Sequence, residues 1–257
     1  ALKRIGDFSG VRSEHVAQPR QLPNRPAPLL PCPSRRELEA IDQRLVRHKA
    51  ADDSILEFPR HNKVMAQPRR LVLASTSRYR KELLGRLGLP FEVAPPEVDE
   101  SPLPGESPAD LALRLAVLKA RSVRAGNALV IGSDQAAALE GRLLGKPGSH
   151  DAAVRQLREL SGKAADFQTA VALLDTETGS LETRVVSCRV TFRSLDERRI
   201  EAYLQREQPY DCTGSAKAEG LGIALIARID TEDPTSLIGL PLIALTELLE
   251  RAGMSVL

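Results

Sequence analysis

The segment from Arg70 to Gly88 constrains the fold of this chain more than any other. Its first part, Leu71 to Ala74, is a short apolar run that predicts a buried strand. Three hydroxyl residues, Ser75 to Ser77, lead into a basic helical pattern, Arg78 to Leu87, which stops at Gly88. A strand that feeds a helix N-terminus leaves unpaired N–H groups and the positive end of the helix dipole facing one point. The segment therefore predicts an α/β unit whose loop binds an anion such as a phosphate chain.

The rest of the chain alternates between strand and helix patterns and contains one long antiparallel hairpin. The predicted strands span residues 91–94, 128–133, 167–174, 181–192 and 223–229, and a weaker hairpin continues over 135–144. The predicted helices span residues 78–87, 108–124, 150–160, 195–205 and 242–251, with N-caps at Ser107, Ser149 and Ser194. Because the hairpin of residues 167–192 breaks a simple doubly wound order, we expect an α/β or mixed α+β fold with a mixed central sheet and a cleft.

Composition excludes several classes of protein. Hydrophobic residues make up 42% of the 257 residues, which is enough for a packed core, whereas the net charge of +2 argues against a binder of nucleic acid polymers. No apolar run approaches the ~18 residues that a membrane span requires. Cys32, Cys188 and Cys212 are odd in number and widely spaced, so they predict neither a disulfide framework nor a zinc site. The simplest location is therefore a reducing cytoplasm.

Composition changes near Met65, the first methionine of the chain. Residues 1–64 hold seven prolines and 12 Lys or Arg against 8 Asp or Glu, whereas the remainder holds 24 against 26. We therefore predict a poorly ordered N-terminal extension, residues 1–64, followed by one domain of residues 65–257. A capping box, Ser34 to Glu37, opens a helix-like pattern, so a short docked helix is the alternative to disorder.

Two groups of carboxylates stand where chemistry is expected. Asp134 follows the predicted strand of residues 128–133, and the carboxyl ends of such strands are where open sheets bind ligands. On position alone, a turn-forming or helix-capping role for Asp134 is slightly favoured over a functional one. The acidic run of residues 97–100 supplies hard oxygen ligands suited to magnesium, with Asp99 and Glu100 as the candidates. Taken alone, such a run is more often a solvated loop.

Several short sequence motifs follow one another along the chain in a characteristic order. They are STSxxR at residues 75–80, EVDE at 97–100, IGSDQ at 131–135, GKP at 145–147, PYDCTGSAKAEGLG at 209–222 and IGLPL at 238–242. In this order the motifs resemble the Maf family of nucleotide pyrophosphatases, and the resemblance covers residues 70–253. Within that family the chain is similar to the YceF-type branch, which acts on 7-methyl-GTP.

The resemblance implies a fold and an activity. The fold would be Maf/ITPase-like, with a mixed central sheet and a nucleotide-binding cleft. The activity would be hydrolysis of a nucleoside triphosphate at the α-phosphate, giving the monophosphate and pyrophosphate, with a divalent metal such as Mg²⁺ or Mn²⁺ and in a homodimer. Two alternatives stay open: a dTTP or UTP pyrophosphatase of the broader Maf type, and a nucleotide-binding regulator of cell division or septum formation.

The resemblance also implies roles for individual residues. Asp134 would be the general base toward water and a metal contact, and Glu100 the preferred metal ligand. Lys119 and Lys146 would line the site as catalytic cations. The other residues that would bind the phosphates are Ser75, Ser77, Arg80 and Lys217.

Three residues would decide which base is accepted. Other Maf branches carry a basic residue at the position of Tyr79 and a threonine at that of Gln135, whereas this chain matches the YceF-type branch. Because 7-methylguanine is a cationic ring, it gains from the aromatic face of Tyr79 by about 1–2 kcal/mol when desolvated. Glu219 would accept hydrogen bonds from its ring N–H and amino group and complement its charge.

Two positions do not fit the resemblance or the proposed chemistry. The family usually shows a Thr-Gly pair where this chain has Thr169-Ala170, so the local backbone must differ if that glycine is needed for a positive φ or a close approach. Cys212 lies in the PYDC loop, but a thiol without a basic partner is a poor nucleophile.

Overall fold

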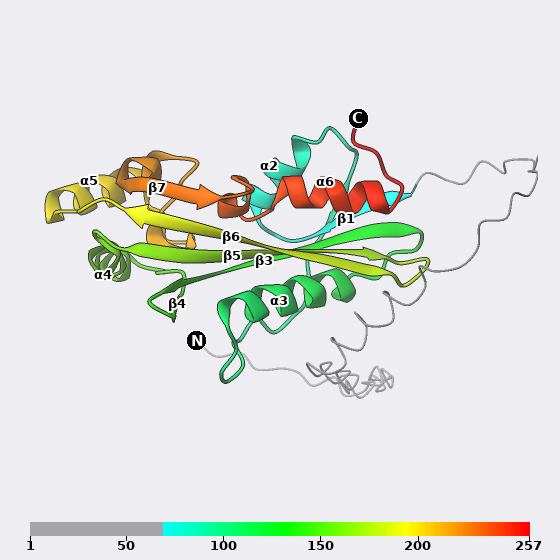
Figure 1. Cartoon of the computed structure of the whole chain (residues 1–257), viewed down its shortest axis with the longest axis horizontal. Coiled ribbons are helices and arrows are strands. Elements are labelled where there is room, and N and C mark those ends of the chain that lie inside the picture. The colour runs from blue at the N-terminus through cyan, green and yellow to red at the C-terminus, as the bar shows by residue number, and fades with distance from the viewer. Residues whose placement is uncertain (1–68) are drawn as a thin grey trace, which may run out of the picture. The chain divides into compact units, whose positions relative to one another are not determined.

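The computed structural model describes residues 69–257, which form a mixed sheet with helices on both faces (Figure 1). The strands are β1 (Arg70–Ala74), β2 (Glu92–Ala94), β3 (Ala128–Leu139), β4 (Arg142–Leu144), β5 (Ala164–Asp175), β6 (Leu181–Phe192) and β7 (Ile226–Thr231). The helices are α2 (Arg78–Gly85), α3 (Pro108–Ser122), α4 (His150–Leu160), α5 (Glu197–Glu207) and α6 (Leu242–Arg251). The predicted extension of residues 1–64 and its capping box lie outside the described residues.

The sheet has the strand order β2-β1-β3-β5-β6-β7, with β4 pairing with β3 off this path. Strand β1 pairs in parallel with β2 and β3, whereas the other pairs are antiparallel. The predicted mixed sheet is therefore confirmed, as is the long hairpin of β5 and β6. Within residues 69–257, no helix is long and apolar enough to cross a membrane.

Strand β3 is flanked by two different strands along one of its edges. Residues 128–132 pair with β1, and residues 137–139 pair with β4. Between them, residues 133–136 have a strand partner only on the opposite edge, in β5. We call this interruption the β3 gap. It leaves room for side chains and a ligand in the plane where a neighbouring strand would otherwise lie.

The predicted end of the central strand is wrong. We expected the strand to stop at Ser133 and Asp134 to follow it, but β3 continues through Asp134 to Leu139. The physical reason is its pairing with β5, which holds residues 129–138 in register without interruption. The weaker hairpin predicted over residues 135–144 is confirmed, and its turn residues Glu140 and Gly141 both have a positive φ, as a two-residue hairpin turn of this kind requires.

Apolar clusters form on the two faces of the sheet and beyond one end of it. Helix α3 covers one face, against residues such as Val72 and Val130, and helices α2 and α6 cover the other face, against Leu73 and Ile131 (Figure 1). A third cluster packs α4 and α5 against the ends of β5 and β6. The alternating pattern of residues 186–192 predicts one inward face for β6, and the structure confirms it, because these alternate residues are all buried: Val186, Cys188, Val190 and Phe192.

Two of the predicted helix caps are confirmed and one is wrong. Ser107 and Ser149 precede α3 and α4, and each side chain accepts a hydrogen bond from a first-turn N–H group. Helix α5, however, is capped by Asp196 and not by Ser194. The reason is that Leu195 is held in place by reciprocal hydrogen bonds with the Ser161 hydroxyl, which delays the first helical turn.

Helix α6 spans the predicted residues, but its cap comes from outside the helix. Asp233 is fully buried, and its Oδ2 accepts a hydrogen bond from the N–H of Ile243 at 2.8 Å. Its Oδ1 accepts from the N–H and hydroxyl of Thr235 at 3.0 and 2.6 Å. One carboxylate therefore fixes both the start of α6 and the loop of residues 235–239, which borders the cavity described below.

Two other boundaries differ from the prediction. Helix α2 ends at Gly85 and not at Leu87, with a further turn before Gly88, whose φ is +69°. Strand β7 begins at Ile226 because residues 221–225 form a 3₁₀ turn.

Gly132 lets α3 lie directly on β3. A Cβ atom at this position would lie 2.0 Å from the Ala116 carbonyl oxygen and 2.6 Å from the Ala120 nitrogen. Because both atoms belong to the helix backbone, they cannot move aside independently. The close approach brings the last turn of α3, which carries Lys119, against the middle of β3.

We predict that Gly132→Ala lowers the free energy of unfolding by about 3 kcal/mol or more, because overpacking against backbone forces the helix away from the sheet. The matched control is Gly126→Ala, where a Cβ meets nothing within 4 Å and φ is not positive. That variant should stay within about 1 kcal/mol of the parent protein. Urea unfolding followed by circular dichroism measures both, and equal stabilities would contradict the close-packing argument.

Candidate active site

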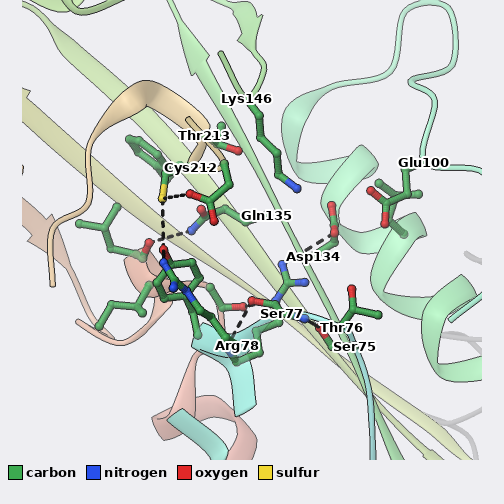
Figure 2. A pocket seen from close by; sticks show the side chains of 18 of the residues that line it. Ser75, Thr76, Ser77, Arg78, Glu100, Asp134, Gln135, Lys146, Cys212 and Thr213 are labelled. Carbon is green, nitrogen blue, oxygen red and sulfur yellow. Dashed lines mark hydrogen bonds and ion pairs between the residues drawn. The ribbon is translucent and has the colours of Figure 1, made fainter. Parts of the chain in front are cut away.

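A cavity of about 600 Å³ opens at the β3 gap. Its walls come from the chain just after β1, from the unpaired edge of β3 and from the chain just after β4 (Figure 2). All but one of the predicted site residues line it; these are Ser75, Ser77, Tyr79, Arg80, Glu100, Lys119, Asp134, Gln135, Lys146 and Glu219. The exception is Lys217.

Two carboxylates meet a buried lysine on one side of the cavity. Lys119, on the last turn of α3, is only 4% exposed. Its Nζ lies 2.6 Å from Asp134 Oδ1 and 2.6 Å from Glu100 Oε1. We predicted that Asp134 lies at the end of its own strand, but it lies in the middle of β3. It lies just beyond the end of the neighbouring strand β1, whose last residue pairs with Gly132. The carboxyl end of a parallel strand next to Asp134 is therefore that of β1.

Arg80 adds a second cation beside Asp134. Its Nη2 lies 3.8 Å from Asp134 Oδ1, and its Nε donates a hydrogen bond of 2.8 Å to the Gly239 carbonyl. The same carbonyl accepts from the Ser133 hydroxyl at 3.0 Å. Gly239 has a φ of +120°, a backbone conformation that favours glycine, which explains the glycine in the IGLPL motif. Burial lowers the pKa of Arg80, while the charges of Asp134 and Glu100 act in the opposite direction.

Glu100 is held in its ionised form. Partial burial alone would raise the pKa of Glu100, but the hydrogen bond and charge of Lys119 lower it by more in total, together with the charges of Lys146 and Arg80. The net pKa lies below the ordinary value for glutamate, so the carboxylate carries its charge at neutral pH. This side of the cavity is thus a compact set of opposite charges.

The loop of residues 75–77, which carries three hydroxyl groups, lines the cavity next to these charges. Ser77 is the N-cap of α2, and its Oγ accepts a hydrogen bond of 3.4 Å from the N–H of Arg80. Ser75 is buried, and its Oγ accepts from the N–H of Ser77 at 3.1 Å. Both hydroxyls act as acceptors in these bonds and keep their protons for donation. No acidic residue occupies the first turn of α2, so the positive end of its dipole is not neutralised.

Tyr79 lies across the cavity from the carboxylates, next to Cys212. Its hydroxyl lies 3.7 Å from Cys212 Sγ, and Figure 2 shows Cys212 and Asp134 on opposite sides of the pocket. Arg78 covers the Tyr79 ring with its Cζ 4.7 Å from the ring centroid, and it donates a hydrogen bond of 2.7 Å to the hydroxyl. The aromatic group is therefore part of a cation–π pair within the protein itself.

Glu219 completes this side of the cavity. Desolvation at the cavity wall raises the pKa of Glu219, and the negative charge of Glu207 adds to the effect. The positive charges of Lys217 and Arg78 oppose it. A carboxylate that is partly desolvated next to cations is suited to accept hydrogen bonds from a cationic ligand.

The orientation of Gln135 follows from its partners. Its Nε2 lies 2.9 Å from Thr169 Oγ1 and from the Ser236 carbonyl oxygen and 3.1 Å from the Leu237 carbonyl oxygen, so its two N–H bonds are shared among three acceptors. Backbone carbonyls only accept, so the amide nitrogen must face them. Oε1 is left as an acceptor at the cavity wall.

The expected problem at Ala170 does not arise. Ala170 lies in β5 directly opposite Asp134, is fully buried and does not have a positive φ. An alanine fits an extended strand without strain, so the local backbone has no need of a glycine here.

Two residues singled out from the sequence, Lys217 and Asp99, do not line the cavity, and a third, Cys212, lines it without being a reactive thiolate. Lys217 directs its Nζ to Glu207 Oε1 at 2.7 Å and lies 6.0 Å from the Tyr79 ring centroid. Asp99 accepts a hydrogen bond from the N–H of Ser101 and does not line the cavity. The pKa of Cys212 is raised to about 11, chiefly by burial, so at neutral pH it is a thiol and a poor nucleophile.

Sequence reasoning missed a residue that joins two walls of the cavity. Gln156 of α4 donates a hydrogen bond of 3.0 Å from Nε2 to the Gly145 carbonyl, next to Lys146. Its Oε1 accepts from the hydroxyl of Ser215, which is buried with a φ of +53°. A glutamine in a helical pattern looks like a surface residue, so no local signal marks this role.

A second missed group holds the acidic loop. Arg114 of α3 donates from Nε to Glu106 Oε1 at 2.6 Å and from Nη2 to the Ser101 carbonyl at 3.0 Å. Glu106 Oε2 also accepts from the N–H of Leu103 at 3.0 Å. These bonds tie the loop that carries Glu100 to the helix that carries Lys119, which stabilises the meeting of the two side chains.

We predict that Gln156→Leu increases amide hydrogen exchange at residues 145–148 and 211–216 by about tenfold or more, since it leaves the hydroxyl of the buried Ser215 without its acceptor, which costs about 1–3 kcal/mol. The matched control is Arg155→Leu, because Arg155 is an exposed residue of the same helix. Hydrogen–deuterium exchange with mass spectrometry measures both segments. Faster exchange in one segment alone, or in both variants equally, would contradict the proposed link.

The chain is similar to known proteins over most of its length. A family model described as "Maf-like protein" matches residues 70–252. Proteins named 7-methyl-GTP pyrophosphatase from Thiobacillus denitrificans and Polaromonas sp. are 58% and 57% identical over 189 residues, which is 73% of this chain and 94% and 86% of theirs. The protein of that name from Nitrosococcus oceani is 56% identical over 192 residues, covering 74% of this chain and 96% of its own.

Among solved structures, a HAM1 protein from Coxiella burnetii matches with a TM-score of 0.37 and 16% identity, over 62% of this chain and 98% of that one. That likeness is too slight to bear on the fold. The family match, by contrast, includes every described strand and helix and all the residues that line the cavity. This chain belongs to the Maf family.

Proposed function

We propose that this protein hydrolyses 7-methyl-GTP to 7-methyl-GMP and pyrophosphate. The observation that carries the proposal is the two-sided cavity, which has ionic groups around Asp134 on one side and Tyr79 with Glu219 on the other. The first side suits a triphosphate and the second suits a cationic base. The relatives named 7-methyl-GTP pyrophosphatase support the same substrate.

We assign the role of general base to Asp134. Its Oδ1 is engaged by Lys119 and Arg80, whereas no residue of the described part of the chain pairs with Oδ2. Oδ2 takes a proton from water as the water oxygen bonds to the α-phosphorus. The bond from that phosphorus to the bridging oxygen breaks, and pyrophosphate leaves with the electron pair.

Lys146 is the cation best suited to the leaving pyrophosphate. It stands on the exposed loop between β4 and α4, and Figure 2 shows its ammonium extending into the pocket. Within residues 69–257 no ion pair engages it, unlike Lys119 and Arg80. Its charge is therefore available to the phosphate oxygens, with the hydroxyls of Ser75 and Ser77 as further donors.

The charged side of the cavity also fits a divalent metal, and we propose Mg²⁺, with Mn²⁺ as a substitute. Glu100 and Asp134 each present an oxygen to the same point, the Lys119 ammonium. The described residues contain no cluster of three His, Cys, Asp or Glu side chains that would hold a metal alone. Magnesium commonly takes one or two carboxylates and completes its shell with phosphate oxygens and water, so this donor set is sufficient. When bound, the metal supplies charge stabilisation at the phosphate oxygens.

Base recognition would combine three kinds of contact. The methylated ring stacks on the face of Tyr79 that Arg78 does not cover, Glu219 accepts from its ring N–H and amino group, and Gln135 Oε1 accepts a further hydrogen bond. Lys217, predicted to contact phosphate, would instead support this wall through Glu207.

We further propose that residues 65–257 form the catalytic domain of a cytoplasmic homodimer. Cys188 and Cys212 are free thiols, which agrees with a reducing compartment. Sedimentation analysis of the full chain tests the dimer.

Pyrophosphate release with Mg²⁺ tests the reaction across 7-methyl-GTP, GTP, dTTP, UTP and CTP. We expect the highest kcat/KM with 7-methyl-GTP. Asp134→Asn should lower kcat by about 10²–10⁴-fold, because it removes the general base. The matched control is Asp166→Asn, which removes an exposed carboxylate paired with Arg189 and should leave the rate unchanged.

The alternative results are distinct. A preference for dTTP or UTP would retain the reaction and overturn the assignment of the base. Release by Asp134→Asn at the parental rate would remove Asp134 from the mechanism. Binding of nucleotides without any release would favour a nucleotide-binding regulator.

Substitution of residues that are proposed to contact the nucleobase provides a separate test. We predict that Tyr79→Arg combined with Gln135→Thr shifts the ratio of kcat/KM values for 7-methyl-GTP and dTTP toward dTTP by about tenfold or more, the equivalent of about 1.4 kcal/mol of discrimination. Steady-state kinetics with both nucleotides measure the ratio. An unchanged ratio would show that the base is recognised elsewhere.

A further inference from the structure

Lys119 holds the position between the two expected metal ligands. Its Nζ lies 2.6 Å from Glu100 Oε1 and 2.6 Å from Asp134 Oδ1, and its side chain is 5% exposed. The ammonium and a metal ion cannot both lie at this point and bind these two oxygens. A metal that binds here must displace the lysine.

The lysine cannot easily withdraw on its own. Helix α3 is held against β3 by the close approach at Gly132, and Arg114 ties the same helix to the loop that carries Glu100. A buried ammonium that lost both carboxylates would also be left without a counter-charge, which is costly. Lys119 therefore moves only when another anion takes over its charge.

The charges around this point already balance. Glu100 and Asp134 are matched by Lys119 and by Arg80, whose Nη2 lies 3.8 Å from Asp134 Oδ1. A divalent ion entering alone would add two positive charges beside Lys119 and Asp134, which are both buried, although the Glu100 side chain is 56% exposed. A triphosphate supplies compensating negative charge and the oxygen ligands that complete a metal shell.

We propose that Lys119 keeps the metal site closed in the free protein, so that the divalent metal binds only together with the nucleotide. This inference rests on the proposed function. In the free protein the ammonium neutralises Glu100 and Asp134, and in the complex it turns to the phosphates while the metal takes the two carboxylates. Metal and nucleotide thus strengthen each other's binding, and the coupling is reciprocal.

The first test measures Mn²⁺ alone, by electron paramagnetic resonance of unbound Mn²⁺ titrated with the full-length protein. We expect the wild-type protein to bind Mn²⁺ with a Kd above about 1 mM. Lys119→Met keeps the length of the side chain and removes its charge, and it should lower that Kd by about tenfold or more. The matched control is Lys163→Met, which removes an exposed lysine paired with Glu140 at 3.1 Å and should behave like the wild type.

Thermal unfolding gives a second readout. Mn²⁺ should raise the Tm of Lys119→Met, whose two carboxylates repel each other, and leave the Tm of the wild type and of Lys163→Met unchanged. In the wild type, an analogue of 7-methyl-GTP with a methylene bridge between the α- and β-phosphorus atoms should bind at least about tenfold more tightly with Mn²⁺ than with a chelator.

Each contrary result is decisive. Micromolar binding of Mn²⁺ by the free wild type would overturn the proposal, and this measurement stands even where Lys119→Met does not fold. A folded Lys119→Met protein that binds Mn²⁺ no better than the wild type would also overturn it. Either result can occur alongside normal pyrophosphate release, whereas failure of the proposed function would appear as no release with any nucleotide.

Discussion

The cavity depends on the unequal lengths of two neighbouring strands. Strand β1 ends at Ala74, level with Gly132, whereas β3 runs on to Leu139 and regains a partner on that edge only at β4. The unpaired stretch between them is long enough to admit side chains from both faces of the sheet. Asp134 and Gln135, which point to opposite faces, therefore border the same space.

The positions of Lys119 and Arg80 depend on the backbone around Gly132 and Gly239 as well as on their ion pairs. Gly132 admits α3 close enough for Lys119 to reach Asp134, and the Gly239 carbonyl orients Arg80. The loop of Gly239 is in turn fixed by Asp233, which also caps α6. Ion pairs in such a setting keep their geometry because the backbones that carry them cannot separate. In the proposed exchange of lysine for metal, that rigidity would keep Lys119 in place until another anion arrives.

Much of the fold was predictable from local patterns, whereas most of the site residues were predicted from the resemblance to the Maf family. The strand–hydroxyl loop–helix unit, the Ser107 and Ser149 caps and the alternating face of β6 each depend on neighbours in the chain. Where a distant partner intervened, prediction failed. Pairing with β5 carried β3 past Asp134, and Ser161 moved the start of α5 from Ser194 to Asp196.

The amino-acid sequence determined which residues have the chemistry: a strand-borne carboxylate, an acidic loop, spaced lysines and a hydroxyl loop at a helix start. Only the tertiary structure decided which of them meet. Lys119 contacts the carboxylates of Glu100 and Asp134. Lys217 instead forms an ion pair with Glu207, and Asp99 accepts a hydrogen bond from Ser101 in its own loop. The supports Gln156, Arg114 and Asp233 also emerged only there. The reason is that local patterns arise from neighbours along the chain, whereas ion pairs and hydrogen bonds between distant segments depend on how close packing brings the backbones together.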